Sequence, residues 1–190
     1  MLYVNSKKAT RIQNVTFSLY QECLELKTTI DEYKKCVDFN SNYIDDTLDK
    51  GRLVSVLLKC LRYRITIGIA NLLDTNKKCL SVYKMLNLYE QMDNKELNKE
   101  VQKAKVDLEK YNVLKNNVKE MRDKMYVHID IVYSLEEGDL FDVDVDVDAL
   151  IEQLDNSLEL IKYIMILCEK LSEKFDRDSL HIKMKNMFNL

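Results

Sequence analysis

The sequence predicts an all-α protein, an antiparallel bundle of four long helices and one short helix. Proline is absent and glycine occurs three times in 190 residues, whereas proteins built from strands and tight turns need more of both. A hydrophobic content of 46% is enough for the core of one domain of this length. We therefore expect a single domain over residues 1–190, with its core over about 11–175 and a short amphipathic tail over 176–190.

The first two long helices follow from the spacing of apolar residues. Steps of three and four predict a helix from Arg11 to Val37. The segment 38–49 is rich in Asn, Ser and Asp, so we expect a connection there. A second helix is predicted from Gly51 to Leu73, and because it is apolar on most sides it suits the centre of the bundle.

The middle of the chain predicts the short helix and a third long one. After a break at 74–76, a helix over 79–92 turns four apolar residues inward, namely Leu80, Tyr83, Leu86 and Met92. Asp93 and Asn94 are good capping residues for a long helix from Lys95 to about Val127. Its apolar stripe comprises Leu97, Val101, Ala104, Leu108, Tyr111, Leu114, Val118, Met121 and Met125.

An acidic segment separates that helix from the last one. Residues 134–148 break the helical pattern, with Gly138 as the expected turn. Aspartate and valine alternate over 142–148, and the last aspartates suit the positive end of a helix over 148–175. A calcium loop would need a glycine at its bend and a glutamate in register, and this segment has neither.

Charge is distributed unevenly along the chain. The formal charge is −3, which argues against general coating of nucleic acid. Residues 51–84 nevertheless carry seven cations against one anion, a net of +6. Residues 136–159 carry ten anions and no cation. The mild average therefore hides two segments of opposite sign.

Five cysteines without a CxxC pair predict reduced, buried thiols and a cytoplasmic protein, as does the lack of a cationic-then-apolar leader. The most apolar run, 53–73, is interrupted by Lys59, Arg62 and Arg64, so we do not expect it to span a membrane. Phosphate-cradling, dinucleotide, serine-hydrolase and zinc motifs are all missing. We therefore expect neither a metal nor a cofactor.

Candidate chemistry concentrates in residues 121–130, where polar groups crowd the end of an apolar stripe. On a helix that turns about 100° per residue, with Val118 at zero, Arg122 lies at roughly +40° and His128 at roughly −80°. Lys115 lies on the same side as Arg122, whereas Asp123 and Asp130 fall well away from the stripe.

Two consequences follow from this wheel. Arg122 occupies a position that suits an apolar residue, so its guanidinium needs a carboxylate, a phosphate or a second subunit. One straight helix cannot bring Arg122 and His128 onto one target. Either the helix bends or ends near Tyr126, or another element or chain completes the site. A purely structural explanation is also available: Arg122 forms a surface ion pair, and His128 is a cation near the carboxyl end of the helix. The pattern alone therefore does not predict an enzyme.

The pattern Arg122-Asp123 followed by His128, with five residues between arginine and histidine, resembles the signature of the HEPN superfamily. His128-Ile129-Asp130 is similar to the His-x-Asp ending of its abortive-infection AbiU-type branch. The passages Leu72-Leu73-Asp74 and 79–86 also look like the second-to-third-helix region of that branch. The resemblance extends over roughly 12–175.

This resemblance implies a helical bundle that dimerises, with two Arg-His motifs facing each other across a cleft. It further implies a metal-independent endoribonuclease of a toxin–antitoxin or anti-phage system, with an antitoxin as a partner. The expected catalytic residues are Arg122 and His128. We expect support from Asp123, Asp130 and Tyr126, and RNA contacts from Lys115, Lys119, Lys124, Arg62 and Arg64.

Two alternatives stay open at this point. HEPN relatives that have lost catalysis act as binding modules, and the ten anions of 136–159 would repel RNA from an adjacent cleft. The other alternative is that the resemblance to the HEPN signature is accidental and that the helical bundle has a purely structural role.

Overall fold

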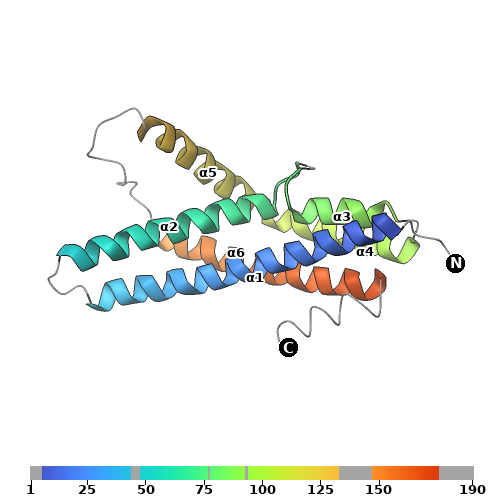
Figure 1. Cartoon of the computed structure of the whole chain (residues 1–190), viewed down its shortest axis with the longest axis horizontal. Coiled ribbons are helices and arrows are strands. Elements are labelled where there is room, and N and C mark those ends of the chain that lie inside the picture. Colours follow the sequence, from blue (N-terminus) through green and yellow to red (C-terminus); the bar gives the residue numbers. More distant parts are fainter. Residues whose placement is uncertain (1–5, 44–47, 77, 93, 133–146, 176–190) are drawn as a thin grey trace. The chain divides into compact units, whose positions relative to one another are not determined.

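The computed structural model describes residues 6–43, 48–76, 78–92, 94–132 and 147–175. Within the helices, side chains at 6, 39–43, 48–52, 55, 124–132 and 147–151 fall outside that description. Every regular element of the described chain is a helix (Figure 1). The predicted all-α fold is therefore confirmed.

The described elements comprise six α-helices and one 3₁₀ turn: α1 (Ser6–Tyr43), α2 (Leu48–Leu72), α3 (Val82–Glu90), α4 (Lys95–Asp107), η1 (Leu108–Tyr111), α5 (Asn112–Val132) and α6 (Val147–Phe175). The run α4–η1–α5 corresponds to the single long helix expected from Lys95 onward. With that run taken as one interrupted helix, the expected four long helices and one short helix are all present.

The expected helix bounds differ from the structure in several places, most clearly in two. The connection placed at 38–49 is mostly helical, because α1 continues to Tyr43 and α2 begins at Leu48. Asn and Ser disfavour a helix by less than about 0.7 kcal/mol each, too little to end one that is already packed. The helix expected over 95–127 is interrupted at Leu108–Tyr111, and α5 then runs on to Val132.

Contacts divide the chain into two units, and α1 and α6 contribute residues to both. The first unit takes its residues from 1–25, 71–110 and 160–190. In its core, Thr16 Oγ1 hydrogen-bonds the hydroxyl of Tyr89 at 3.2 Å, and the Tyr89 ring meets Phe175 edge-on with centroids 5.7 Å apart. Burial raises the pKa of Tyr89 to about 12, so this hydroxyl stays protonated.

Side-chain caps fix the starts of α3 and α4 in this first unit. Ser81 Oγ accepts a hydrogen bond from the backbone N–H of Lys84. Asn94 Oδ1 accepts from the N–H groups of Glu96 and Leu97. Each side chain satisfies donors that the first helical turn leaves without partners. The capping role predicted for Asn94 is thus confirmed.

The second unit takes its residues from 26–70 and 111–159, which places parts of α1, α2, α5 and α6 together. Gly68 allows α2 to approach α1 closely. A Cβ at this position would lie 2.2 Å from Cδ2 of Leu26, a fully buried core side chain.

The expectation that α2 is buried on most sides was wrong for its first half. Ile65, Ile69 and Leu72 are buried, but Leu53 and Leu57 are 70% and 44% exposed. No described helix is apolar over a stretch long enough to cross a bilayer. All five cysteines are free thiols, of which Cys23 and Cys168 are buried. The predicted acidic loop over 134–146 and the tail over 176–190 lie outside the described residues.

Candidate active site

Helix α5 positions Arg122 through the burial of its neighbours. Leu114 and Val118 are buried and Met121 is half-buried, so the inward face of α5 is the one that the apolar pattern predicted. Arg122 lies on the shoulder of that face, with its side chain 22% exposed. The guanidinium is therefore held near the apolar surface but remains within reach of solvent.

The carboxylate partner of Arg122 is its neighbour in sequence. Nε and Nη2 of Arg122 donate to the same Oδ1 of Asp123 at 3.1 and 3.0 Å. The helical spacing predicted that Asp123 lies well away from the side of α5 that carries Arg122, and this holds for its Cα. The long arginine side chain nevertheless reaches the Asp123 carboxylate. Of the five N–H donors of a guanidinium, two point at Asp123.

His128 lies on the same continuous helix, which extends past it to Val132. The option that the helix ends near Tyr126 is therefore wrong. Six residues of helix separate Arg122 from His128 by about 9 Å along the axis and about 120° around it. Side chains from Lys124 to Asp130, including Tyr126, lie outside the described residues, although their backbone is helical.

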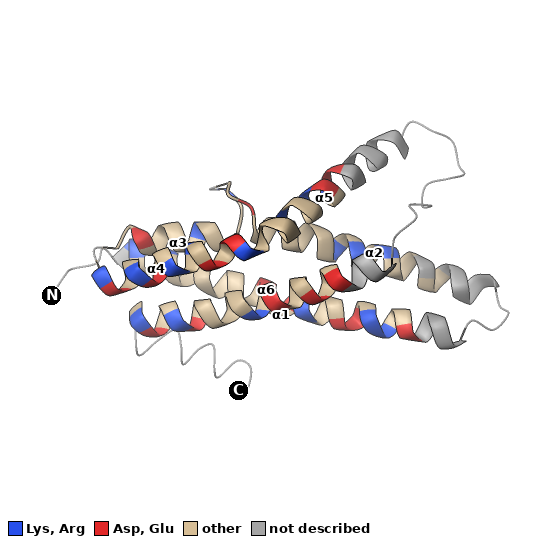
Figure 2. Ribbon diagram, turned by 180° about the vertical axis from the view of Figure 1, so that it is seen from behind, with Lys and Arg blue, Asp and Glu red and all other residues tan. Residues whose placement is uncertain are grey.

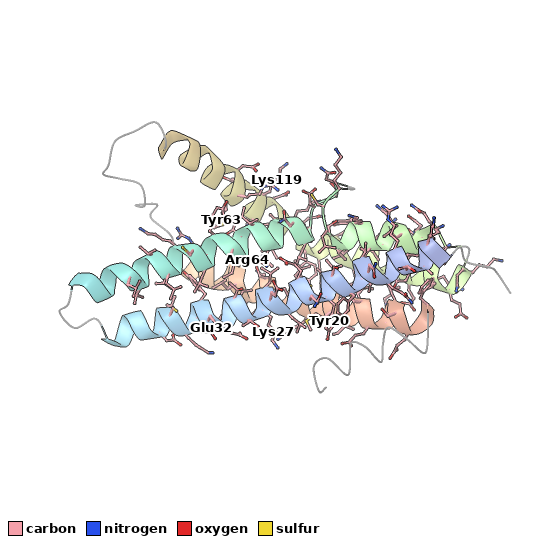
Figure 3. The ribbon with its side chains drawn as sticks, viewed as in Figure 1. Tyr20, Lys27, Glu32, Tyr63, Arg64 and Lys119 are labelled. Carbon is pink, nitrogen blue, oxygen red and sulfur yellow. The ribbon has the colours of Figure 1, made fainter. Side chains whose placement is uncertain are left out.

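Three cations form a row beside the apolar face of α5. Lys115, Lys119 and Arg122 follow at steps of four and three, so they share one side of the helix. Lys119 is exposed and projects from α5 in Figure 3, and Lys115 is half-buried. The row extends about 10 Å along α5, at 1.5 Å per residue.

The two α2 arginines predicted to contact RNA do not join this row as a single surface. Arg62 and Arg64 are both half-buried, and they leave α2 about 160° apart. Nη1 of Arg64 lies 2.8 Å from the place that a Cβ on Gly68 would take. Arg62 instead lines a cavity inside the second unit. Figure 2 shows Lys and Arg along both α2 and α5.

That cavity is a feature that sequence reasoning missed. It measures about 10 Å³, room for one water molecule. Its lining comprises Tyr33, Arg62, Ile65, Thr66, Val118, Met121, Gln153, Leu154 and Ser157. Burial raises the pKa of Tyr33, while the nearby charge of Arg62 acts in the opposite direction. The available signal was a polar residue at a position that suits an apolar one: Thr66 lies between Ile65 and Ile67, and Ser157 follows the buried Leu154 by three residues.

The cavity places Arg62 beside the segment of α5 that carries the motif. Met121, which shares the cavity lining with Arg62, immediately precedes Arg122. Among the described residues, no cluster of three or more His, Cys, Asp or Glu side chains is arranged to hold a metal ion.

The all-helical fold of the described chain and the Arg-x5-His pattern on α5 are those expected from the resemblance to the HEPN class of proteins. Within that class, the family model described as AbiU2 matches residues 11–181. The chain therefore belongs to the HEPN AbiU2 family, which is associated with abortive infection and defence. No curated protein and no solved structure matches the chain.

Proposed function

We propose that this chain is a metal-independent endoribonuclease of a toxin–antitoxin or anti-phage defence system. The observation that carries the proposal is the position of Arg122: a partly buried guanidinium, on the same continuous helix as His128, at the end of a row of cations. Family membership supports the proposal, because HEPN proteins commonly use this motif on RNA.

The chemistry needs one proton carrier and one stable cation. In the proposed reaction the 2′-oxygen of RNA forms a bond to the adjacent phosphorus, and the bond to the 5′-oxygen breaks. His128 accepts the 2′-hydroxyl proton and supplies a proton to the leaving 5′-oxygen. Histidine suits both roles because the pKa of a free histidine side chain is about 6.5. Arg122 neutralises the phosphoryl oxygens through its planar fork. The products are a 2′,3′-cyclic phosphate and a 5′-hydroxyl.

Asp123 has a defined place in this scheme. In the free protein it accepts from two donors of Arg122, and its own side chain is 55% exposed. An ion pair of this exposure contributes at most about 1 kcal/mol, so a phosphate can displace the carboxylate. Asp123 thus keeps the guanidinium oriented until RNA arrives.

A second chain supplies the missing half of the site in our proposal. Arg122 and His128 leave α5 about 120° apart around the helix axis. The two residues of one continuous helix therefore cannot both contact the same phosphate. Two copies that place their α5 helices face to face bring Arg122 of one chain opposite His128 of the other. The site is then shared across a homodimer.

The test is cleavage of total RNA with EDTA present. We expect wild type to release fragments that end in a 2′,3′-cyclic phosphate, and Arg122→Ala and His128→Ala to lose at least about 100-fold in rate. Arg11→Ala is the matched control, since Arg11 is an exposed arginine on α1. Cleavage at equal rates by all four proteins would mean contamination or another site.

A non-catalytic binding module is the second candidate. It is favoured by the ion pair that already satisfies part of Arg122 and by the ten anions of 136–159. RNA binding that depends on Arg122 without any cleavage, even at high protein concentration, would support this candidate over the first.

A further inference from the structure

The cavity of the second unit is lined by several hydrogen-bond donors. The guanidinium of Arg62, the hydroxyls of Tyr33 and Thr66 and the side-chain amide of Gln153 can all donate. No carboxylate belongs to the described residues that line the cavity, and the rest of the lining is mostly apolar. A group bound there therefore meets donors and one positive charge, but no negative charge.

Thr66 is a buried donor of this set, with 3% of its surface exposed. Hydroxyls inside helices often donate to the carbonyl four residues earlier, as Thr16 does to Ile12. Among the described residues, none forms a hydrogen bond with the Thr66 hydroxyl. The described buried side-chain atom that lacks both a partner and contact with water-sized space is Oδ1 of Asn98, so a small ligand can reach Thr66. An unbonded buried hydroxyl is unfavourable, and we expect a group in the cavity to accept its proton.

Arg62 supplies the positive charge of the cavity. Its side chain is half-buried, and its charge acts on Tyr33, where it lowers the pKa against the effect of burial. Within the part of the chain that the structure describes, no carboxylate forms an ion pair with Arg62. From Gly51 to Leu72 the sequence has four cations and no anion. A guanidinium that is partly removed from water and has no counterion attracts an anion.

The size of the cavity decides which kind of anion fits. A volume of about 10 Å³ is room for one small sphere, so phosphate and sulfate, with several heavy atoms each, are too large. A halide ion is a single sphere somewhat larger than water. Met121, an unbranched and half-buried part of the lining, can make the small shift that a halide needs. A water molecule would also fit, but it would leave the charge of Arg62 without a counterion.

We propose that the cavity beside Arg62 binds a single halide ion, with Arg62 as the counterion and the hydroxyls of Thr66 and Tyr33 as donors. In ordinary salt solutions this ion is chloride. The inference is independent of RNA cleavage, because these three residues take no part in the proposed bond cleavage. The lining comes from α1, α2, α5 and α6, so the bound ion stabilises the packing of all four helices in the second unit.

Urea unfolding of the full chain tests the site, with sodium gluconate replaced stepwise by sodium chloride at constant ionic strength. One site on the folded chain lowers the unfolding equilibrium constant up to tenfold for each tenfold rise in chloride. We expect at least a tenfold fall over the series for wild type, and none for Arg62→Gln or Thr66→Val. The matched controls should keep the chloride dependence: Arg11→Gln changes an exposed arginine of α1, and Thr16→Val changes a buried threonine whose hydroxyl donates within the chain.

The line width of the chloride nuclear magnetic resonance signal tests binding without unfolding. Wild type should broaden this signal, and the broadening should fall severalfold for Arg62→Gln and Thr66→Val, each verified as helical by circular dichroism. Bromide should abolish the broadening by competition, whereas sulfate at the same ionic strength should not. If neither variant folds, this competition on wild type decides alone.

Three results would each overturn the proposal. Wild type without chloride dependence or broadening would mean that the cavity holds only water. Equal chloride dependence of wild type and folded Arg62→Gln would place the ion elsewhere. Competition by sulfate as strong as that by bromide would mean an open surface site and not this cavity.

Discussion

Arg122 directs two nitrogens, Nε and Nη2, at one oxygen of its neighbour Asp123. This arrangement holds the guanidinium plane on the shoulder of α5 but leaves the second carboxylate oxygen outside the pair. Because Asp123 is 55% exposed, water screens the attraction. The contact therefore orients Arg122 more than it stabilises the fold, and this distinction leads to the first prediction.

Asp123→Ala should change the free energy of unfolding by less than about 1 kcal/mol and should tighten binding of single-stranded RNA severalfold. The reason is that the substitution removes a carboxylate that competes with phosphate for Arg122. Urea unfolding and RNA titration of the same preparation measure both quantities. Weaker RNA binding, or a loss of stability above about 2 kcal/mol, would show that Asp123 has another role.

Lys119→Ala should weaken RNA binding without changing stability, since Lys119 is exposed in the row that ends at Arg122. Loss of one phosphate contact to a single strand should reduce the slope of log affinity against log salt by about 0.7. Lys103→Ala is the matched control, an exposed lysine on α4. An equal change in slope for both variants would remove Lys119 from the proposed RNA contact.

Gly68→Ala should destabilise the protein by about 1 to 2 kcal/mol, although alanine is about 1 kcal/mol better in a helix. The added Cβ would lie 2.2 Å from Cδ2 of Leu26, so the buried leucine must shift. The same substitution made in a Leu26→Ala background should be neutral or stabilising, because the space is then available. The same loss in both backgrounds would rule out this steric cause.

The ion pairs of Glu100 should make the free energy of unfolding depend on pH. Hydrogen bonds from Lys170 and Lys174 lower the pKa of Glu100 from 4.5 to about 2. A lowered folded-state pKa stabilises the protein above about pH 4.5, and this contribution is lost as the pH falls toward 2.

Glu100→Gln should therefore cost about 1 kcal/mol at pH 7, the upper end for a partly exposed pair, and almost nothing near pH 2. Urea unfolding at both pH values measures the difference from wild type. Glu152→Gln, a change at an exposed glutamate of α6, is the control. A cost for Glu100→Gln that does not shrink in acid would contradict the ion-pair explanation.

The fold was largely predictable because it depends on the spacing of apolar residues. The stripe through Val101, Leu108 and Val118 is buried as expected, and Asn94 caps α4. The 3₁₀ turn at Leu108–Tyr111 was not predicted, since a one-turn tightening leaves the apolar spacing almost unchanged. The exposure of Leu53 was also missed, because hydrophobicity alone does not distinguish a buried position from an exposed one.

The candidate site was predictable in part. The shoulder position of Arg122 followed from the wheel, but its bond to Asp123 depends on the reach of a flexible side chain. The buried polar positions of Thr66 and Ser157 did not locate the cavity beside Arg62, because its lining comes from four helices that are distant in the chain. A pattern along one helix predicts which side a residue occupies, and tertiary packing then decides what it meets.

Activity of mixed variants tests most directly the claim that two chains share the site. Arg122→Ala and His128→Ala are each inactive alone in our account. After they are unfolded together and refolded at equal amounts, half of the dimers contain one of each chain, and one of the two sites in such a dimer is intact. RNA cleavage in EDTA should then return to about a quarter of the wild-type rate. No recovery, with dimer formation verified by sedimentation, would contradict a site built from Arg122 of one chain and His128 of the other.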